Sequence, residues 1–311
     1  MALGHTWPRR LRQALALAVF LAGTLPSAGA DLTSAYADAW RRDCAFGAAH
    51  ATVLRRHKVL LVSGYFGDVD PKYFADHLRW LASLRVDAEK VAVKSRQSIA
   101  VNAPIVAAAI RGSAKPVLLI THSKGSVDTL EALLAEPALR SKVKGWISLQ
   151  GAFLGSPVAD MLLNGSLLDP VTAIAILQFF GGSKESAEDL TTAASRAWYK
   201  ERAPAIDALL REVPAVAFAS SLDGPQSRAS GILEISRQLM ASRGIASDGL
   251  MPPGSTLLPG MDYVEVTGVD HIAPVMPALE PFDRVRMTRA LLLAMRAPFR
   301  GLPADARCGK A

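Results

Sequence analysis

One serine lies in a setting that is typical of a catalytic nucleophile. Ser123 is the third residue of the segment 121–125 (THSKG), which follows an apolar stretch at 116–121. A sharp turn between a strand and a helix lifts a serine hydroxyl clear of a sheet, and this turn requires small residues two positions before and after the serine. Gly125 meets the requirement, whereas Thr121 replaces the glycine that is usual at the earlier position.

A nucleophilic serine needs a base to take its proton and a carboxylate to orient that base. When the nucleophile follows a strand, the partners come later in the chain, acid first and histidine second. His271 is the histidine that lies beyond Ser123, after the last expected strand, 262–267. We expect Asp248, which a glycine follows, to be the acid, with Asp223 as the competing choice. Asp270 is adjacent to His271, so its side chain should point away from the ring.

The oxyanion of a tetrahedral intermediate needs two backbone N–H donors. The residue after the nucleophile supplies the first, which is Lys124 here. The second is expected from the loop 63–67 (SGYFG), at Tyr65 or Phe66, although a plain strand-to-helix turn has a similar composition. The side chains of His122 and Lys124 are expected to shape the turn rather than to act as bases.

Strands and helices alternate in the elements that must position these residues. Strands are expected at 58–62, 89–93, 116–121, 145–149, 215–220 and 262–267, and helices at 34–56, 71–84, 100–111 and 126–134. Continuous apolar strands that alternate with helices predict an α/β fold, with a mostly parallel sheet covered by helices on both faces. The segment from about 155 to 205 has no strand signal and is expected to be a helical insertion.

The composition excludes several classes of protein. Half of the 311 residues are apolar and 20% are charged, which excludes a disordered or fibrous chain and favours one domain with an insertion. The formal net charge is +7, but Arg9, Arg10 and Arg12 lie in a segment that we expect to be removed. The modest remaining charge and the few aromatic residues argue against a nucleic-acid partner.

The N-terminal residues have the three parts of an export signal. A basic stretch (PRRLR) precedes an apolar run at 14–25, and small residues follow before Asp31. The run is too short for a permanent membrane span, which needs roughly 20 apolar residues. We therefore expect a signal peptide at 1–30 and a catalytic domain at 31–311, in the periplasm or outside the cell; an uncleaved anchor is the alternative.

Two cysteines, Cys44 and Cys308, stand near the ends of the expected mature chain. In an oxidising compartment they are expected to form a disulfide, the alternative being two unpaired thiols. Their spacing to histidines does not fit a zinc site, and the sequence predicts no cofactor and no metal ion.

The chain resembles bacterial secreted triacylglycerol lipases and esterases of the α/β-hydrolase superfamily, from about Lys58 to Val275. The resemblance is carried by 121–125 (THSKG), 154–160 (LGSPVAD), 190–193 (LTTA), 247–252 (SDGLMP) and His271. It implies an α/β-hydrolase fold with a helical lid, and hydrolysis of carboxylic esters through an acyl-enzyme intermediate. In these lipases the aspartate of the Asp-Gly-Leu turn is the triad acid, which supports Asp248 over Asp223.

Two departures from this pattern mark a divergent chain. Many such lipases bind calcium through an aspartate two residues after the histidine, but Ala273 stands there, and Pro274 and Pro277 follow. No calcium site is therefore expected. The cysteines also lie nearer the chain ends than the bridging pair that such lipases often carry.

An apolar stretch at 161–180 bears on the substrate. As a lid it would cover the site and make transient contact with a lipid surface when open; the alternative is a buried cap helix. An apolar lid favours a hydrophobic ester or lipid substrate. A polyester depolymerase, a thioesterase and an acyltransferase use the same triad and remain alternatives, as does a non-catalytic hydrolase-fold protein that binds an apolar ligand.

Overall fold

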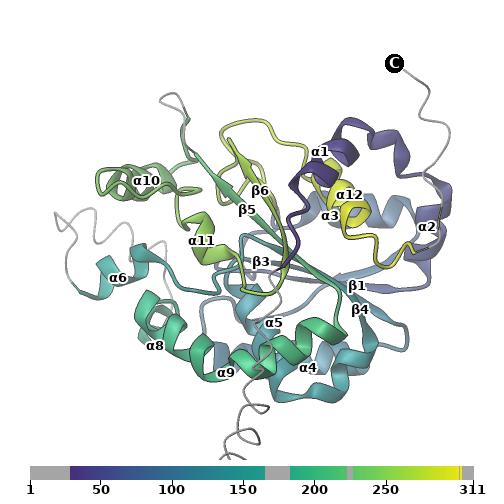
Figure 1. Ribbon diagram of the computed structural model, residues 1–311, viewed down its shortest axis with the longest axis horizontal. Helices are drawn as coiled ribbons and strands as arrows, with labels where there is room; N and C mark the ends of the chain where they lie inside the picture. The colour runs from purple at the N-terminus through teal and green to yellow at the C-terminus, as the bar shows by residue number, and fades with distance from the viewer. Residues whose placement is uncertain (1–28, 165–182, 223–226, 301, 303–311) are drawn as a thin grey trace, which may run out of the picture.

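A single six-stranded sheet forms the centre of the molecule. The computed structural model describes residues 29–164, 183–222, 227–300 and 302 (Figure 1). The strand order is β2-β1-β3-β4-β5-β6, and every neighbouring pair is parallel. The strands are β1 (Lys58–Val62), β2 (Asp87–Lys90), β3 (Val117–His122), β4 (Val143–Leu149), β5 (Ala215–Ser221) and β6 (Asp262–Thr267). The parallel α/β sheet expected from the sequence is confirmed.

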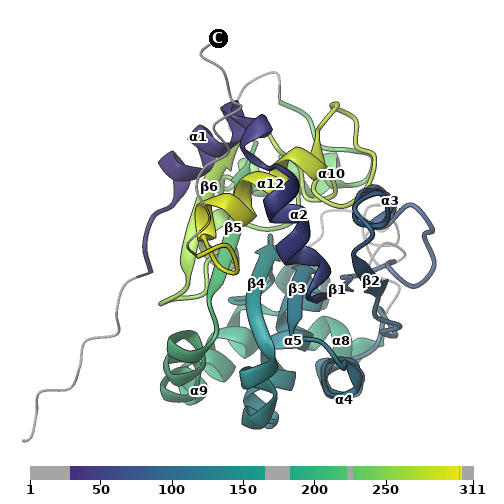
Figure 2. The same ribbon diagram turned by 90° about the vertical axis from the view of Figure 1, so that its right-hand side faces the viewer.

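Helices cover both faces of the sheet, as Figure 2 shows. One layer contains α1 (Thr33–Arg41), α2 (Ala48–Arg55), α3 (Ala75–Ser83) and α12 (Arg284–Met295), and the other contains α4 (Ile99–Gly112), α5 (Lys124–Ala135) and α9 (Thr192–Glu212). Shorter helices follow the carboxyl ends of the strands: α6 (Pro157–Leu163), α8 (Lys184–Glu188), α10 (Leu233–Ala241) and α11 (Pro253–Thr256). Two 3-10 turns, η2 (Asp43–Ala45) and η3 (Pro137–Lys142), complete the described elements.

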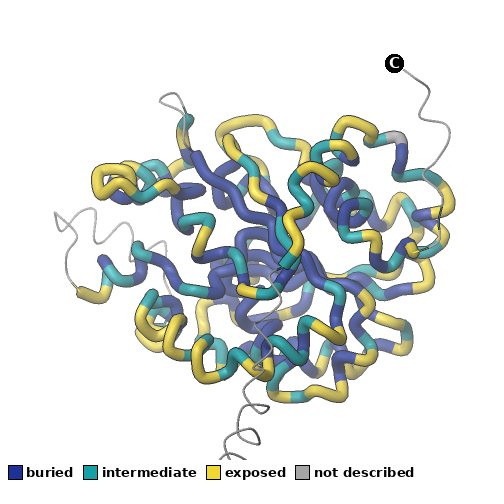
Figure 3. The backbone as a smooth tube through the Cα atoms, in the orientation of Figure 1, coloured by how far each residue is buried: buried dark blue, intermediate teal, exposed yellow. Residues whose placement is uncertain are grey.

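Successive side chains along each strand point to opposite faces of the sheet, and a separate hydrophobic core lies on each face. In β1, Val59 and Leu61 pack with the layer of α1, α3 and α12, while Leu60 and Val62 pack with the layer of α4 and α5. All four are essentially inaccessible to solvent, and the tube in Figure 3 is buried along most of the central strands. Burial of such a side chain contributes about 1.5–3 kcal/mol, which is why these strands are apolar on both faces.

Two of the predicted elements differ from the structure. The predicted strand 89–93 is wrong in position, because β2 ends at Lys90; Val91 follows it and donates its N–H to the Leu61 oxygen at 2.9 Å. The residues of this edge strand are half exposed, so apolar character did not mark it. The predicted single helix 34–56 is divided into α1, η2 and α2, because Gly47 is extended (φ −104°, ψ −169°) and allows the chain to turn.

The described part of the expected insertion is helical. It comprises α6, α8 and α9, and α9 continues to Glu212, past the expected end at 205. The Asp160 carboxylate joins two of these helices by accepting from the Thr192 N–H at 2.8 Å. Residues 165–182, which hold most of the apolar stretch of the predicted lid, lie outside the described residues.

The predicted signal peptide and the predicted Cys44–Cys308 disulfide also fall on parts that are not described, namely residues 1–28, the side chain of Cys44 and residue 308. Among the helices of the described ranges, none is long and apolar enough to cross a membrane.

Candidate active site

Ser123 occupies a tight turn between β3 and α5. Its backbone has a positive φ (φ 52°, ψ −129°), a conformation that costs a residue with a Cβ about 1–3 kcal/mol. The turn is packed against the end of β1: a Cβ at Gly125 would lie 2.6 Å from the carbonyl oxygens of Val62 and Ser63. Position 125 therefore requires a glycine, because a side chain there would collide with the main chain at the end of β1.

The threonine that replaces the usual glycine at position 121 has a role of its own. Thr121 is fully buried, and its hydroxyl oxygen accepts from the Trp146 indole N–H at 2.9 Å. The same hydroxyl bonds to the Ser126 hydroxyl at 2.8 Å, and Ser148 donates to Ser126 at 2.9 Å. A glycine at 121 would leave the buried indole N–H of Trp146 without this partner, which explains the departure from the common motif.

The structure brings Ser123, His271 and Asp248 together at the carboxyl end of the sheet. The Nε2 atom of His271 lies 2.9 Å from the Ser123 Oγ, and its Nδ1 lies 2.8 Å from the Asp248 Oδ2. All three side chains are at most 5% exposed. Because a carboxylate only accepts, Nδ1 of His271 carries the proton in this pair and Nε2 is left to accept from the serine hydroxyl.

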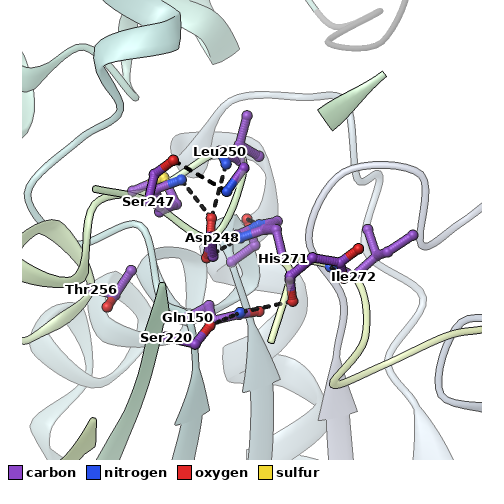
Figure 4. A network of polar contacts seen from close by, with 12 residues as sticks. Gln150, Ser220, Ser247, Asp248, Leu250, Thr256, His271 and Ile272 are labelled. Carbon is purple, nitrogen blue, oxygen red and sulfur yellow. Dashed lines mark hydrogen bonds and ion pairs between the residues drawn. The ribbon is translucent and has the colours of Figure 1, made fainter. Parts of the chain in front are cut away.

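The turn between α10 and α11 fixes the carboxylate of Asp248. Its Oδ1 accepts from the N–H groups of Leu250 and Met251 at 2.9 and 2.7 Å. Figure 4 shows Asp248 between Leu250 and His271. The competing acid Asp223 lies outside the described residues.

Asp270 points away from the ring of His271, as the sequence predicted. Its Oδ1 accepts from the N–H groups of Ile272 and Ala273, and its Oδ2 accepts from the N–H of Ser230 at 2.9 Å. The carboxylate therefore stabilises the loop that carries His271.

Both segments expected to supply the oxyanion donors adjoin Ser123. Lys124 is the first residue of α5, so its N–H precedes the first helical hydrogen bond. In the other loop, a Cβ at Gly64 would lie 2.8 Å from the Ser123 Cβ, so this loop touches the nucleophile. Phe66 has a positive φ of 64°, and the Tyr65 hydroxyl is hydrogen-bonded to Ser186 of α8.

The side chain of Lys124 takes no part in the cleft. It is wholly buried, and its Nζ lies 2.7 Å and 3.0 Å from the two carboxylate oxygens of Asp128, one turn along α5. Burial raises the pKa of Asp128 to about 7, although the Lys124 ammonium acts in the opposite direction. The Lys124–Asp128 pair is thus buried within α5, next to the turn, and the Lys124 side chain is not placed to act as a base, as expected.

A cleft of about 540 Å³ opens beside Ser123 and His271. Most of the other side chains on its walls are apolar or aromatic: Tyr65, Phe66, Val69, Pro71, Tyr73, Leu250, Ile272 and Met276. Asp70 and Lys72 stand on the same walls, and Lys72 is exposed. A pocket of this size and lining suits a hydrophobic ligand.

Known proteins resemble this chain in structure. No protein-family model matches the chain, and no curated protein matches it. The structure is similar to a metagenomic carboxyl esterase, with a TM-score of 0.63 and 22% identity over 78% of this chain and 76% of the other. It is also similar to a mature lipase of Bacillus licheniformis, with a TM-score of 0.58 and 18% identity over 70% of this chain and 85% of the other. The fold is that of the α/β-hydrolases.

In this α/β-hydrolase fold, sequence reasoning missed three buried polar residues near the site. Gln150 follows β4, Ser220 is near the end of β5, and Tyr73 precedes α3. All three are at most 3% exposed. Gln150 and Ser220 could have been found as polar residues at the carboxyl ends of apolar strands, where sites of parallel sheets gather. Tyr73 carries no such signal, since it lies in a loop.

Proposed function

We propose that the chain is a serine hydrolase of carboxylic esters with hydrophobic acyl groups. The observation that carries the proposal is the continuous chain of hydrogen bonds from Asp248 through His271 to Ser123, on the wall of an apolar cleft. The similarity to a carboxyl esterase and a lipase supports the same class of reaction.

In the proposed mechanism, the Ser123 Oγ attacks the ester carbonyl carbon while Nε2 of His271 takes the hydroxyl proton. Asp248 holds the ring and stabilises the imidazolium. The N–H of Lys124 and that of Tyr65 or Phe66 stabilise the oxyanion. His271 then gives the proton to the leaving alcohol oxygen, and a water molecule, activated by the same ring, attacks the acyl-enzyme and regenerates Ser123.

The apolar walls of the cleft support an acyl group as the part of the substrate that is bound there. Each methylene that is transferred from water contributes about 0.8 kcal/mol, so kcat/KM is expected to rise about fourfold for each added methylene until the cleft is filled. The basic and apolar N-terminal run supports a further proposal, that the enzyme acts after export from the cytoplasm.

The test is hydrolysis of p-nitrophenyl esters of increasing acyl length, together with labelling by a fluorophosphonate. Wild-type protein should be labelled at Ser123 and Ser123→Ala should not. Matched acyl thioesters in the same series separate an esterase from a thioesterase. Equal rates for wild type and Ser123→Ala on every ester, with no labelling, would reject the proposal.

A further inference from the structure

Three successive carbonyl groups of the His271 loop are each held by a side chain from a different strand. The Ser220 hydroxyl donates to the Val269 oxygen at 2.9 Å, and the Gln150 amide donates to the Asp270 oxygen at 3.0 Å. The third carbonyl, that of His271 itself, accepts from the Nε2 atom of His122 at 2.8 Å.

The donors follow the order of the sheet, because Ser220, Gln150 and His122 stand at the ends of the neighbouring strands β5, β4 and β3. Gln150 also donates to Ser220 at 2.6 Å, and Figure 4 places this pair beneath His271. The main chain at and before His271 is thus hydrogen-bonded to the sheet at three successive carbonyl groups.

His122 continues this network on its other side. A carbonyl oxygen only accepts, so Nε2 of His122 carries the proton and Nδ1 of the neutral ring accepts. The Tyr73 hydroxyl is hydrogen-bonded to this Nδ1 and therefore donates to it. The same hydroxyl accepts from the Gly64 N–H at 3.0 Å. A directed chain of hydrogen bonds consequently runs from the Gly64 loop, through Tyr73 and His122, to the carbonyl of His271.

The side chains of Tyr73 and His122 are both uncharged. Tyr73 is 3% exposed and His122 is 2% exposed. Burial lowers the pKa of His122 well below its usual value and raises that of Tyr73. Neutrality of His122 matters because its ring centroid is 4.8 Å from that of His271, where a second positive charge would oppose formation of the imidazolium. Buried polar groups are costly unless they are paired, and here each polar atom of the two side chains has a partner.

We propose that Tyr73 and His122 are positioning residues that hold the Gly64 loop and the main chain of His271 in one fixed relation to Ser123. The loop carries the second proposed oxyanion donor, and His271 is the proposed base. The side chains of Tyr73 and His122 therefore set the distance between this donor and this base. This inference rests on the proposed function, since it assigns a role in that reaction.

The first test removes single groups from the pair. Tyr73→Phe keeps the ring and removes the hydroxyl, leaving Gly64 N–H and His122 Nδ1 without their partner. Loss of one such bond in a buried site corresponds to about a tenfold fall in kcat, with little change in KM. The rate of fluorophosphonate labelling of Ser123 should fall by a similar factor, because that step uses the same serine, base and oxyanion donors.

His122 offers conservative variants that separate its two bonds. His122→Gln can donate an amide N–H to the His271 carbonyl and should restore part of the kcat that His122→Leu loses. A double variant, Tyr73→Phe with His122→Leu, should lose about as much as His122→Leu alone, because both substitutions interrupt one chain. The matched control is His57→Asn: His57 is buried at the opposite end of β1 and pairs with the Val53 oxygen, so this variant should alter stability and leave kcat unchanged.

A spectroscopic measurement tests the network apart from turnover. Nitrogen-15 NMR of the wild-type histidines should show His122 as the neutral Nε2–H form, and exchange of the Gly64 amide proton should be faster in Tyr73→Phe. A His122 protonated on Nδ1 would overturn the inference. So would an active wild type whose kcat survives Tyr73→Phe and His122→Leu within about twofold. A wild type that neither hydrolyses esters nor reacts with the fluorophosphonate would instead reject the proposed function itself, and this result is distinguishable because the NMR assignment would still stand.

Discussion

Asp248 and His271 are joined twice: the His271 main-chain N–H donates to the Asp248 main-chain oxygen at 2.9 Å, alongside the 2.8 Å bond between their side chains. The backbone bond sets the separation of the two loops, and the side-chain bond selects the tautomer of the ring. With Oδ1 of Asp248 already occupied by two N–H groups, the carboxylate has one orientation in which Oδ2 faces the ring. The proposed base is therefore oriented before any substrate binds.

The first expectation concerns Asp248→Asn. An amide at this position presents either an oxygen or an N–H to His271, and the two N–H donors at the turn require the amide oxygen, so the N–H group faces the ring. This favours the tautomer with the proton on Nε2, which cannot accept from Ser123, and kcat is expected to fall by about 10³- to 10⁴-fold. Steady-state kinetics measures the fall. Asp223→Asn serves as the comparison, and a larger loss there would move the acid to Asp223.

A second expectation follows from the positive φ of Ser123. Both Ser123→Ala and Ser123→Gly remove the nucleophile and should abolish ester hydrolysis. Glycine adopts φ 52° without strain, whereas alanine retains its Cβ, so Ser123→Gly should be more stable than Ser123→Ala by about 1 kcal/mol. Urea unfolding of the two variants gives the difference directly. Equal or reversed stabilities would show that the turn is not strained at this residue.

The sequence predicted those features that depend on neighbours along the chain. The apolar runs of β1 and β3 are buried almost throughout and therefore visible as runs, and Ser123 directly follows β3. Asp248 was visible from the glycine that follows it, and His271 from its place shortly after β6, a strand that is only partly buried. The structure brings these three together. Edge strand β2 was misplaced because half-exposed strands have no such run. Tyr73 could not be foreseen, since its partners lie nine and forty-nine residues away and meet it only in the folded chain.

The third expectation concerns the close approach of the Gly64 loop to the nucleophile. A Cβ at position 64 would lie 2.8 Å from the Ser123 Cβ and 3.1 Å from the His122 oxygen, both on the rigid turn. Gly64→Ala should therefore push the loop away and lower kcat by about tenfold or more, since the second oxyanion donor loses its position. Gly112→Ala is a matched control in which the added methyl meets nothing within 4 Å. Unchanged kcat in Gly64→Ala would show that the loop does not contribute a donor.

The last expectation is a dependence of the free energy of unfolding on pH that arises from a buried histidine other than His271 and His122. His77 is wholly buried in α3 and donates from Nε2 to Thr288; burial, and then the positive charge of Arg284, lower its pKa to about 3. Between about pH 3 and pH 6.5 the unfolded chain binds a proton at His77 that the folded chain does not. The contribution of this residue is therefore fully present above about pH 6.5 and is lost as the pH falls.

In this window His77 adds a slope of about 1.4 kcal/mol per pH unit to the free energy of unfolding. His77→Gln keeps an N–H for Thr288 but cannot titrate, so its stability should fall less steeply on acidification than that of wild type. Asp128 acts with the opposite sign, because its raised pKa makes stability decline as the pH rises from 3.8 to about 7. Since both proteins contain Asp128, its effect cancels in the difference between their urea unfolding curves at successive pH values. Parallel curves from about pH 4 to pH 7 would mean that His77 binds its proton over the same pH range in the folded and the unfolded protein, with a water molecule or a local opening supplying the partner that its Nδ1 lacks among the described residues.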